Sequence, residues 1–124
     1  MSLASLLSRV MAAMQANSIC KEVKCTESRA FSPDQFYFKI RSRLKTGEAL
    51  QVRVYSNQGH IDYAYQVFTD EPVIRWDNKE DYPNVGTFPH HFHDQSGNVT
   101  ESELRGEPYA DIHTVLAAIA ARPE

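Results

Sequence analysis

The chain has 124 residues, of which 42% are hydrophobic and 23% are charged, and this ordinary globular composition predicts a single domain spanning residues 1–124. Its apolar runs are far shorter than the roughly 18 residues that span a membrane, and no signal-peptide pattern is found, so we expect no membrane contact and a cytoplasmic location. The formal net charge of -3 argues against bulk affinity for nucleic acid, which a strongly basic domain usually provides.

The first part of the chain predicts a helix followed by a strand. Apolar residues recur at the i, i+3, i+4 spacing of an amphipathic helix over about residues 3–15. Residues 19–28 are rich enough in β-forming side chains for a first strand, and residues 32–34 predict a turn after it. Cys20 and Cys25 are five positions apart and point to opposite faces of such a strand, so we expect no disulfide between them, as in a reducing compartment.

Two antiparallel hairpins are predicted next. Alternation of apolar and polar residues predicts strands at residues 36–44 and 50–55 with a turn between them. Residues 61–68 and 73–78 predict a second hairpin around a turn at 69–72. One face of the first hairpin is apolar. The other face is basic and aromatic, with Tyr37, Lys39, Arg41, Arg43, Arg53 and Tyr55.

The last part of the chain completes an α+β fold. Residues 87–93 predict a short strand, 94–98 a turn, and the apolar residues from Tyr109 onward a C-terminal helix with Pro108 in its first turn. We therefore expect an antiparallel sheet of about five or six strands, with the N-terminal and C-terminal helices packed on one face and the other face polar.

Three of the five histidines of the chain lie within four positions, at His90, His91 and His93. In a strand, His91 and His93 point the same way, whereas His90 points to the other face. Histidine both donates and accepts protons near neutral pH, which suits acid-base catalysis. Arg75 and Asp77 share a face of the preceding strand and could supply an oxyanion clamp and a carboxylate that orients an imidazole.

Two other interpretations of the three histidines stay open at this point. An H-x-H pair on one strand face can present two metal ligands, with Asp77 or Asp94 as a third. Alternatively, the histidines pack an edge strand and have no chemical role.

The basic face of the first hairpin also has several interpretations. Between residues 37 and 55, five basic side chains stand against one acidic side chain. Arginine and lysine beside tyrosine are typical of surfaces that bind the phosphates and stack the bases of single-stranded RNA. A solvated sheet face shows the same alternation, and an acidic partner protein is a third interpretation.

The order of these motifs resembles the TumE family of small toxins from bacterial and archaeal toxin-antitoxin pairs. The resemblance covers residues 36–120 and consists of L-x-x-G-x-x-L at 44–50, Tyr63-Ala64-Tyr65, Arg75-Trp76-Asp77-Asn78, Thr87-Phe88-Pro89-His90-His91-Phe92-His93, and a helix with Val115-Leu116. It implies a growth-inhibiting toxin, a cognate helix-turn-helix antitoxin as partner, and RNA cleavage as the activity. The motif positions that it carries over are Arg75, Asp77, Asn78, His90, His91 and His93.

The chain departs from the family pattern directly after Asn78. The family usually continues with an A-P-H-H-type stretch, whereas this chain has Lys79-Glu80-Asp81-Tyr82, so histidines that normally lie beside the site are missing. Tyr82 could supply a polar hydroxyl in their place.

Together, the residues and the resemblance predict a metal-independent endoribonuclease that acts on single-stranded RNA and needs no cofactor. In this prediction His91 and His93 exchange protons with the RNA, Arg75 stabilises the charge on phosphorus and Asp77 orients a histidine. A second copy of the chain is a further expected partner, as a homodimer. A non-catalytic protein-binding module and a metal-dependent hydrolase that uses the histidine cluster are the alternatives.

Overall fold

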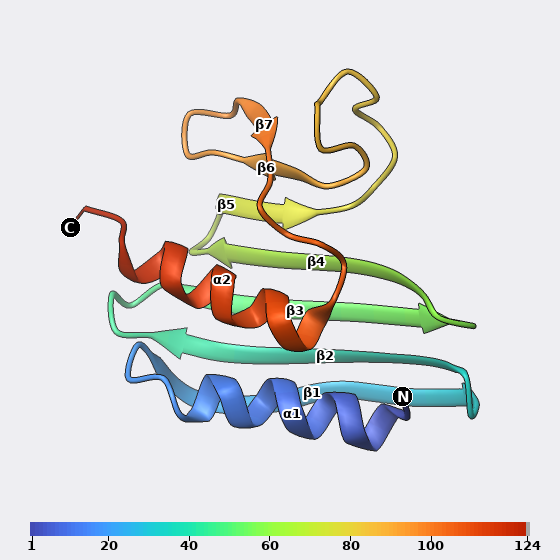
Figure 1. Cartoon of the computed structure of the whole chain (residues 1–124). Coiled ribbons are helices and arrows are strands. Elements are labelled where there is room, and N and C mark those ends of the chain that lie inside the picture. Colours follow the sequence, from blue (N-terminus) through green and yellow to red (C-terminus); the bar gives the residue numbers. More distant parts are fainter. Residues whose placement is uncertain (124) are drawn as a thin grey trace.

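The computed structural model describes residues 1–123, which form one antiparallel sheet and two helices (Figure 1). Each strand of the sheet pairs with its neighbours in sequence, so the sheet runs in the order β1 to β7. In chain order the elements are α1 (Leu3–Gln15), β1 (Cys20–Ser32), β2 (Gln35–Leu44), β3 (Ala49–Asn57), β4 (His60–Phe68), β5 (Pro72–Asp77), β6 (His91–His93), β7 (Val99–Glu101) and α2 (Pro108–Ala120).

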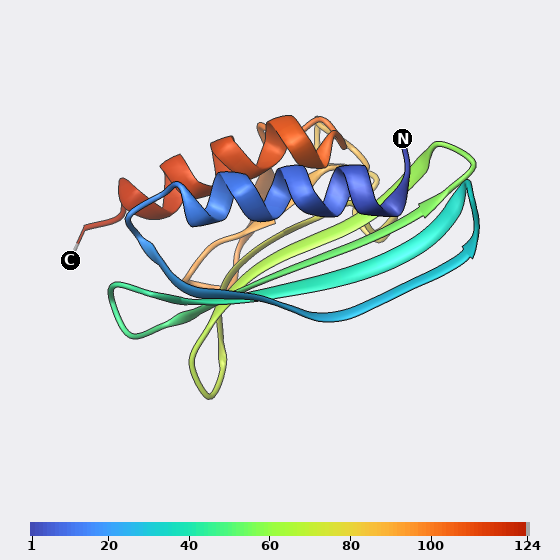
Figure 2. The same ribbon diagram turned by 90° about the horizontal axis from the view of Figure 1, so that it is seen from below.

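Both helices pack on the same face of the sheet, as the sequence predicts (Figure 2). The apolar residues of β2, β3 and β4 face the helices and form the core together with them. Strand alternation therefore leaves the opposite face, here called the open face, lined mainly by polar side chains. No helix within residues 1–123 is long and apolar enough to cross a membrane.

The short loops and helix ends follow local rules. The Ser2 hydroxyl caps α1 by accepting a hydrogen bond from the Ser5 backbone N–H at 3.1 Å. Gln58 and Gly59 join β3 to β4 with φ angles of +52° and +84°, as a tight type I′ hairpin turn requires. Before α2, the buried Asp111 carboxylate accepts hydrogen bonds from three backbone N–H groups, of residues 105, 106 and 107, that the helix leaves unpaired.

The α+β prediction is confirmed, but several element boundaries differ. The sheet has seven strands, because residues 99–101 form a seventh. The first strand is also longer than predicted, since β1 continues to Ser32. The predicted strand at residues 87–93 begins only at His91. Residues 85–90 form turns instead. The N–H groups of Phe88 and His90 each donate a hydrogen bond to the carbonyl oxygen three residues earlier, so these N–H groups are not available for pairing with a neighbouring strand.

Candidate active site

The pairing of β5 with β6 brings four polar side chains together on the open face. Arg75 lies opposite His93, and Asp77 lies opposite His91. The residues between them, Trp76 and Phe92, point to the helix-covered face, where their rings pack 4.9 Å apart. The predicted alternation is thus confirmed for both strands, and strand register alone sets Arg75, Asp77, His91 and His93 side by side.

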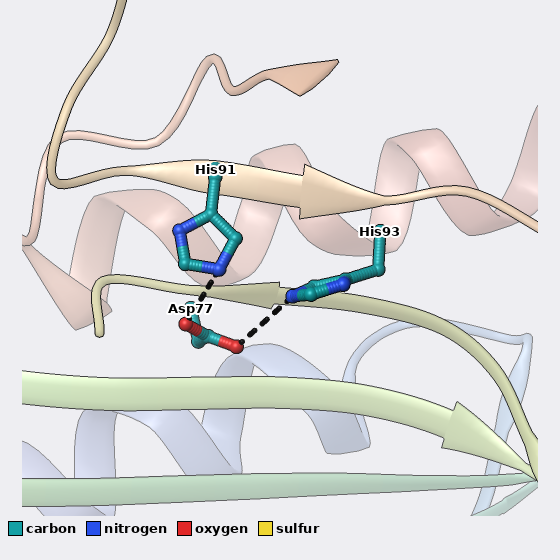
Figure 3. Close-up of side chains that lie close together, drawn as sticks. All are labelled: Asp77, His91 and His93. Carbon is teal, nitrogen blue, oxygen red and sulfur yellow. Dashed lines mark ion pairs between the residues drawn. The ribbon is translucent and has the colours of Figure 1, made fainter. Parts of the chain in front are cut away.

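Asp77 is the centre of this cluster, and its carboxylate is bound from several sides (Figure 3). Its Oδ1 lies 2.9 Å from His91 Nε2 and accepts a hydrogen bond from the Lys79 backbone N–H at 3.0 Å. Its Oδ2 accepts a hydrogen bond from Arg75 Nε at 2.7 Å and lies 3.6 Å from His93 Nε2.

The cationic surroundings of Asp77 keep its carboxylate ionised. Burial, with only 5% of the residue exposed, would raise the pKa of the Asp77 carboxyl. The hydrogen bonds from Arg75 and Lys79 and the charges of His91 and Arg75 outweigh burial, so the pKa is lowered from its usual value. Asp77 is therefore a fixed negative charge at neutral pH, held by a guanidinium group.

His91 is almost completely buried, with 1% exposed. Its Nδ1 lies 3.1 Å from the carbonyl oxygen of Pro89, which can only accept, so this nitrogen carries a proton. Its Nε2 faces Asp77 at ion-pair distance without the alignment of a hydrogen bond. His91 therefore lies against the carboxylate in the protein interior and is not placed to contact a substrate.

His93 lies at the surface, with 29% of its side chain exposed. Burial has the largest effect on the pKa of His93 and lowers it. The charge of Asp77 raises the pKa, whereas the charges of His91 and Arg75 lower it. The pKa of His93 is therefore below its usual value. The neutral imidazole therefore predominates at neutral pH, and this is the form that accepts a proton. Of the two histidines on the open face, only His93 combines this form with access from solvent.

Tyr82 is also accessible from solvent, and it lies beside both imidazoles. Its ring centre is 4.7 Å from that of His91 and 5.7 Å from that of His93, in an edge-on contact with the latter. The residue comes from the segment in which this chain departs from the family pattern, and 36% of it is exposed.

His90 does not join the cluster. It lies toward the helix-covered face, where its Nδ1 is 2.7 Å from the Tyr63 hydroxyl and its ring stacks on that of Tyr63. Burial, together with the charges of Asp111 and Asp77, raises the pKa of Tyr63 far above its usual value, so the hydroxyl keeps its proton in this contact. His90 thus ties the loop before β6 to β4.

Asn78, the residue directly after β5, makes two hydrogen bonds to β4. Its Oδ1 accepts a hydrogen bond from the Tyr63 N–H at 3.0 Å, and its Nδ2 donates one to the Ile61 carbonyl oxygen at 2.7 Å. These bonds continue the β4 to β5 ladder beyond Asp77, the last residue of β5. Asn78 therefore fixes the chain where it leaves the site.

The basic and aromatic residues of β2 and β3 share the open face with the cluster, as the alternation predicts. Tyr37 lies directly opposite Tyr55, and Lys39 directly opposite Arg53. Like charges in directly opposed positions of a sheet destabilise it, and the Glu27 carboxylate lies 4.0 Å from Lys39 Nζ. Arg41 and Arg43 lie further along β2; Arg41 bonds to Gln51, and Arg43 pairs with Glu22.

Three side chains of the cluster could also hold a metal ion. The ligand atoms of Asp77, His91 and His93 lie within 4.8 Å of one another. The Arg75 guanidinium bonded to Asp77 Oδ2 already supplies positive charge to this carboxylate, which opposes the binding of a cation there.

Two residues of the site were not predicted from the sequence. Gln66 lies opposite Arg75 in β4 and accepts a hydrogen bond from Arg75 Nη1 at 2.7 Å. The backbone N–H of Lys79 bonds to Asp77. Gln66 could have been found by extending the register of the second hairpin from its turn, whereas the Lys79 contact depends on how the chain bends after β5.

A comparison with known families agrees with the motif order. A family model described as "Toxin TumE" matches residues 10–123. No similar curated protein and no similar solved structure was found. Because the match covers nearly the whole chain, including β5, β6 and the cluster between them, the chain belongs to the TumE toxin family and is the toxin component of a toxin-antitoxin system.

Proposed function

We propose that this toxin is a metal-independent endoribonuclease that cleaves single-stranded RNA at the cluster around Asp77. The observation that carries the proposal is the surface-exposed His93, 3.6 Å from an ionised and arginine-bound carboxylate on an open, basic sheet face. This combination offers a proton acceptor, an oxyanion clamp and a phosphate-binding surface in one place.

In this proposal His93 is the general base. Its neutral imidazole removes the proton from a ribose 2′-hydroxyl, and the resulting oxygen attacks the adjacent phosphorus. Asp77 orients His93 and stabilises the imidazolium that forms. Arg75, whose Nη1 and Nε are fixed by Gln66 and Asp77, stabilises the charge that develops on the phosphoryl oxygens.

The leaving 5′-oxygen needs a proton from a second group. The burial of His91 removes it from direct contact with RNA, so His91 is a positioning residue here. Tyr82 lies beside His93 and is exposed, and we assign its hydroxyl as the general acid. The products would be a 2′,3′-cyclic phosphate and a free 5′-hydroxyl.

The basic residues of β2 and β3 bind the RNA backbone in this proposal. Lys39 and Arg53 are directly opposed and gain stability when a phosphate lies between them. Tyr37 and Tyr55 offer rings on which unpaired bases stack. Single-stranded RNA fits this surface better than a duplex, because only unpaired bases expose the faces that stack.

Cleavage of a labelled RNA oligonucleotide by the purified protein in the presence of chelator tests the proposal. His93→Gln should reduce the rate by about 100-fold or more, as the loss of a general base does, and Tyr82→Phe by a similar factor while it keeps the ring packing. The matched control is His113→Gln, since His113 is exposed on α2, away from the open face. Cleavage by a His91→Ala, His93→Ala double variant at the wild-type rate would refute the proposal.

Metal dependence is decided by the same assay. Cleavage that stops with chelator and returns with one metal equivalent would make Asp77, His91 and His93 metal ligands and the protein a metal-dependent hydrolase. Binding without any cleavage would make it a non-catalytic module.

The antitoxin partner is proposed to be a small helix-turn-helix protein from the adjacent gene. Induced expression of the toxin should stop growth, and co-expression of that gene should restore it. Growth arrest that the neighbouring gene does not relieve would contradict this assignment.

A further inference from the structure

A hollow of about 350 Å³ opens on the face of the sheet directly beside the catalytic cluster. It runs from β5 across β4 to β2, and its volume is within the range of small-ligand sites. Its lining residues are Tyr37, Arg53, Tyr55, Asp62, Tyr63, Arg75, Asp77, Asn78 and Lys79.

Sheet register explains why this face is hollow. Ala64 of β4 lies opposite Arg53 of β3 on one side and opposite Asp77 of β5 on the other. The methyl group of Ala64 is the smallest side chain in that row of the open face. Arg53 and Asp77, which both line the hollow, are therefore about two strand spacings or 10 Å apart, with no long side chain between them in that row.

The hollow has two chemically different ends. The end at β5 contains the cations Arg75 and Lys79 beside Asp77, where the proposed phosphate reacts. At the other end Tyr37 and Tyr55 face each other across the strands. The Tyr55 hydroxyl accepts a hydrogen bond from Gln35 Nε2 at 2.7 Å, which holds its ring in place.

A carboxylate stands at the aromatic end. Asp62 lies directly opposite Tyr55 and has 57% of its side chain exposed. The His60 Nε2 lies 3.3 Å from Asp62 Oδ1, and both side chains are more than half exposed. A carboxylate can only accept hydrogen bonds, so a ligand at this end must present donors to it.

We propose that this hollow binds one nucleotide of the RNA substrate and that the nucleotide is a guanosine, an inference that rests on the endoribonuclease function proposed above. The guanine ring stacks against Tyr55 and Tyr37. Guanine presents two adjacent N–H donors, N1–H and the 2-amino group, which match the two oxygens of Asp62. Adenine, cytosine and uracil each place an acceptor next to the donor on that edge, so they bring a lone pair toward the carboxylate.

Binding of single nucleotides tests this inference without any cleavage. The full-length protein is titrated with guanosine, adenosine, cytidine and uridine 3′-monophosphates in a calorimeter. A bidentate pair is worth about 1–3 kcal/mol of discrimination, so the guanosine nucleotide should bind about 5-fold to 150-fold more tightly than the others. Asp62→Asn, which replaces an acceptor oxygen by a donor amide, should remove this preference.

Asp70→Asn is the matched control, because Asp70 is an exposed aspartate in the loop between β4 and β5, outside the hollow. It should bind like the wild type. Asp62→Ala should lose the preference as Asp62→Asn does, and both substitutions should preserve the fold because the side chain is exposed.

Equal affinity for the four nucleotides, or a guanosine preference that survives both Asp62 variants, would overturn the inference. Mapping the cleavage sites in an RNA of mixed sequence separates this inference from the proposed function. Cleavage without preference for a guanosine would leave the endoribonuclease in place and remove the guanosine site. Selective guanosine binding without cleavage would leave the site and remove the enzyme.

Discussion

Replacing Asp77 by asparagine removes the one negative charge that the cluster shares. The substitution keeps the shape of the side chain, so the strand pairing of β5 with β6 should persist. It removes the negative charge from a carboxylate whose oxygens lie 2.7 Å from Arg75, 2.9 Å from His91 and 3.6 Å from His93. These three side chains then face a neutral amide.

The expected cost in stability follows from burial. Removing one partner of a buried ion pair costs about 3–5 kcal/mol. Arg75 retains 32% exposure of its side chain and its hydrogen bond to Gln66, so we expect about 2–3 kcal/mol for Asp77→Asn after allowing for solvent screening. That is less than the stability of a typical domain, so the variant should still fold at 25 °C.

The pH dependence of this cost has a definite sign. The pKa of Asp77 is lowered in the folded protein from its usual value of 3.8. Its contribution to the free energy of unfolding is therefore complete above about pH 4 and is lost as the pH falls through the lowered pKa. The stability difference between wild type and Asp77→Asn should shrink below about pH 4.

Two assays check these statements on the same preparations. Urea unfolding gives the free energy difference at pH 7 and at pH 3, and cleavage of a labelled RNA gives the rate, which should fall by about 100-fold or more because His93 loses its orienting anion. An Asp77→Asn protein that cleaves RNA at the wild-type rate would refute the role given to the cluster. A stability difference that grows toward acid would refute the ionised state of Asp77.

Three further predictions concern single residues. The acid limb of the pH profile of kcat/KM should lie below pH 6.5, the usual pKa of histidine, because burial and the charges of His91 and Arg75 outweigh the charge of Asp77 and lower the pKa of His93. An acid limb above about pH 7 would contradict this. Arg53→Gln should reduce the slope of log binding constant against log salt concentration by about 0.7, the value for one phosphate contact with a single strand, and an unchanged slope would remove Arg53 from the RNA surface. Asn78→Asp should destabilise the protein by about 1–3 kcal/mol in urea unfolding, since the Ile61 carbonyl oxygen loses its donor, whereas the exposed control Asn98→Asp should be neutral.

The sequence alone determined the faces of the sheet. Alternation with period two assigned the apolar residues of β2 and β3 to the core and Tyr37, Lys39, Arg53 and Tyr55 to the opposite side, because neighbouring side chains of a strand must point to opposite faces. The same rule placed His91 and His93 together.

The sequence was less successful where the backbone is neither helix nor strand. The composition of residues 87–93 predicts a strand that begins at Thr87. In the structure, the backbone groups of His90 form hydrogen bonds with Thr87 within a turn instead of with a neighbouring strand. The seventh strand, at residues 99–101, was missed because three residues carry too little alternation to be recognised.

Only the tertiary structure distinguished the residues of the cluster from one another. Burial of His91 and exposure of His93 depend on which segments cover them, and the covering ring of Tyr82 comes from a loop whose path no local pattern predicts. The hollow likewise depends on the tertiary structure, because Arg53 and Asp77, 24 positions apart in the chain, line it from the strands on either side of β4. The period of a strand is a local property of the backbone, whereas contacts between distant segments depend on how the whole sheet is assembled.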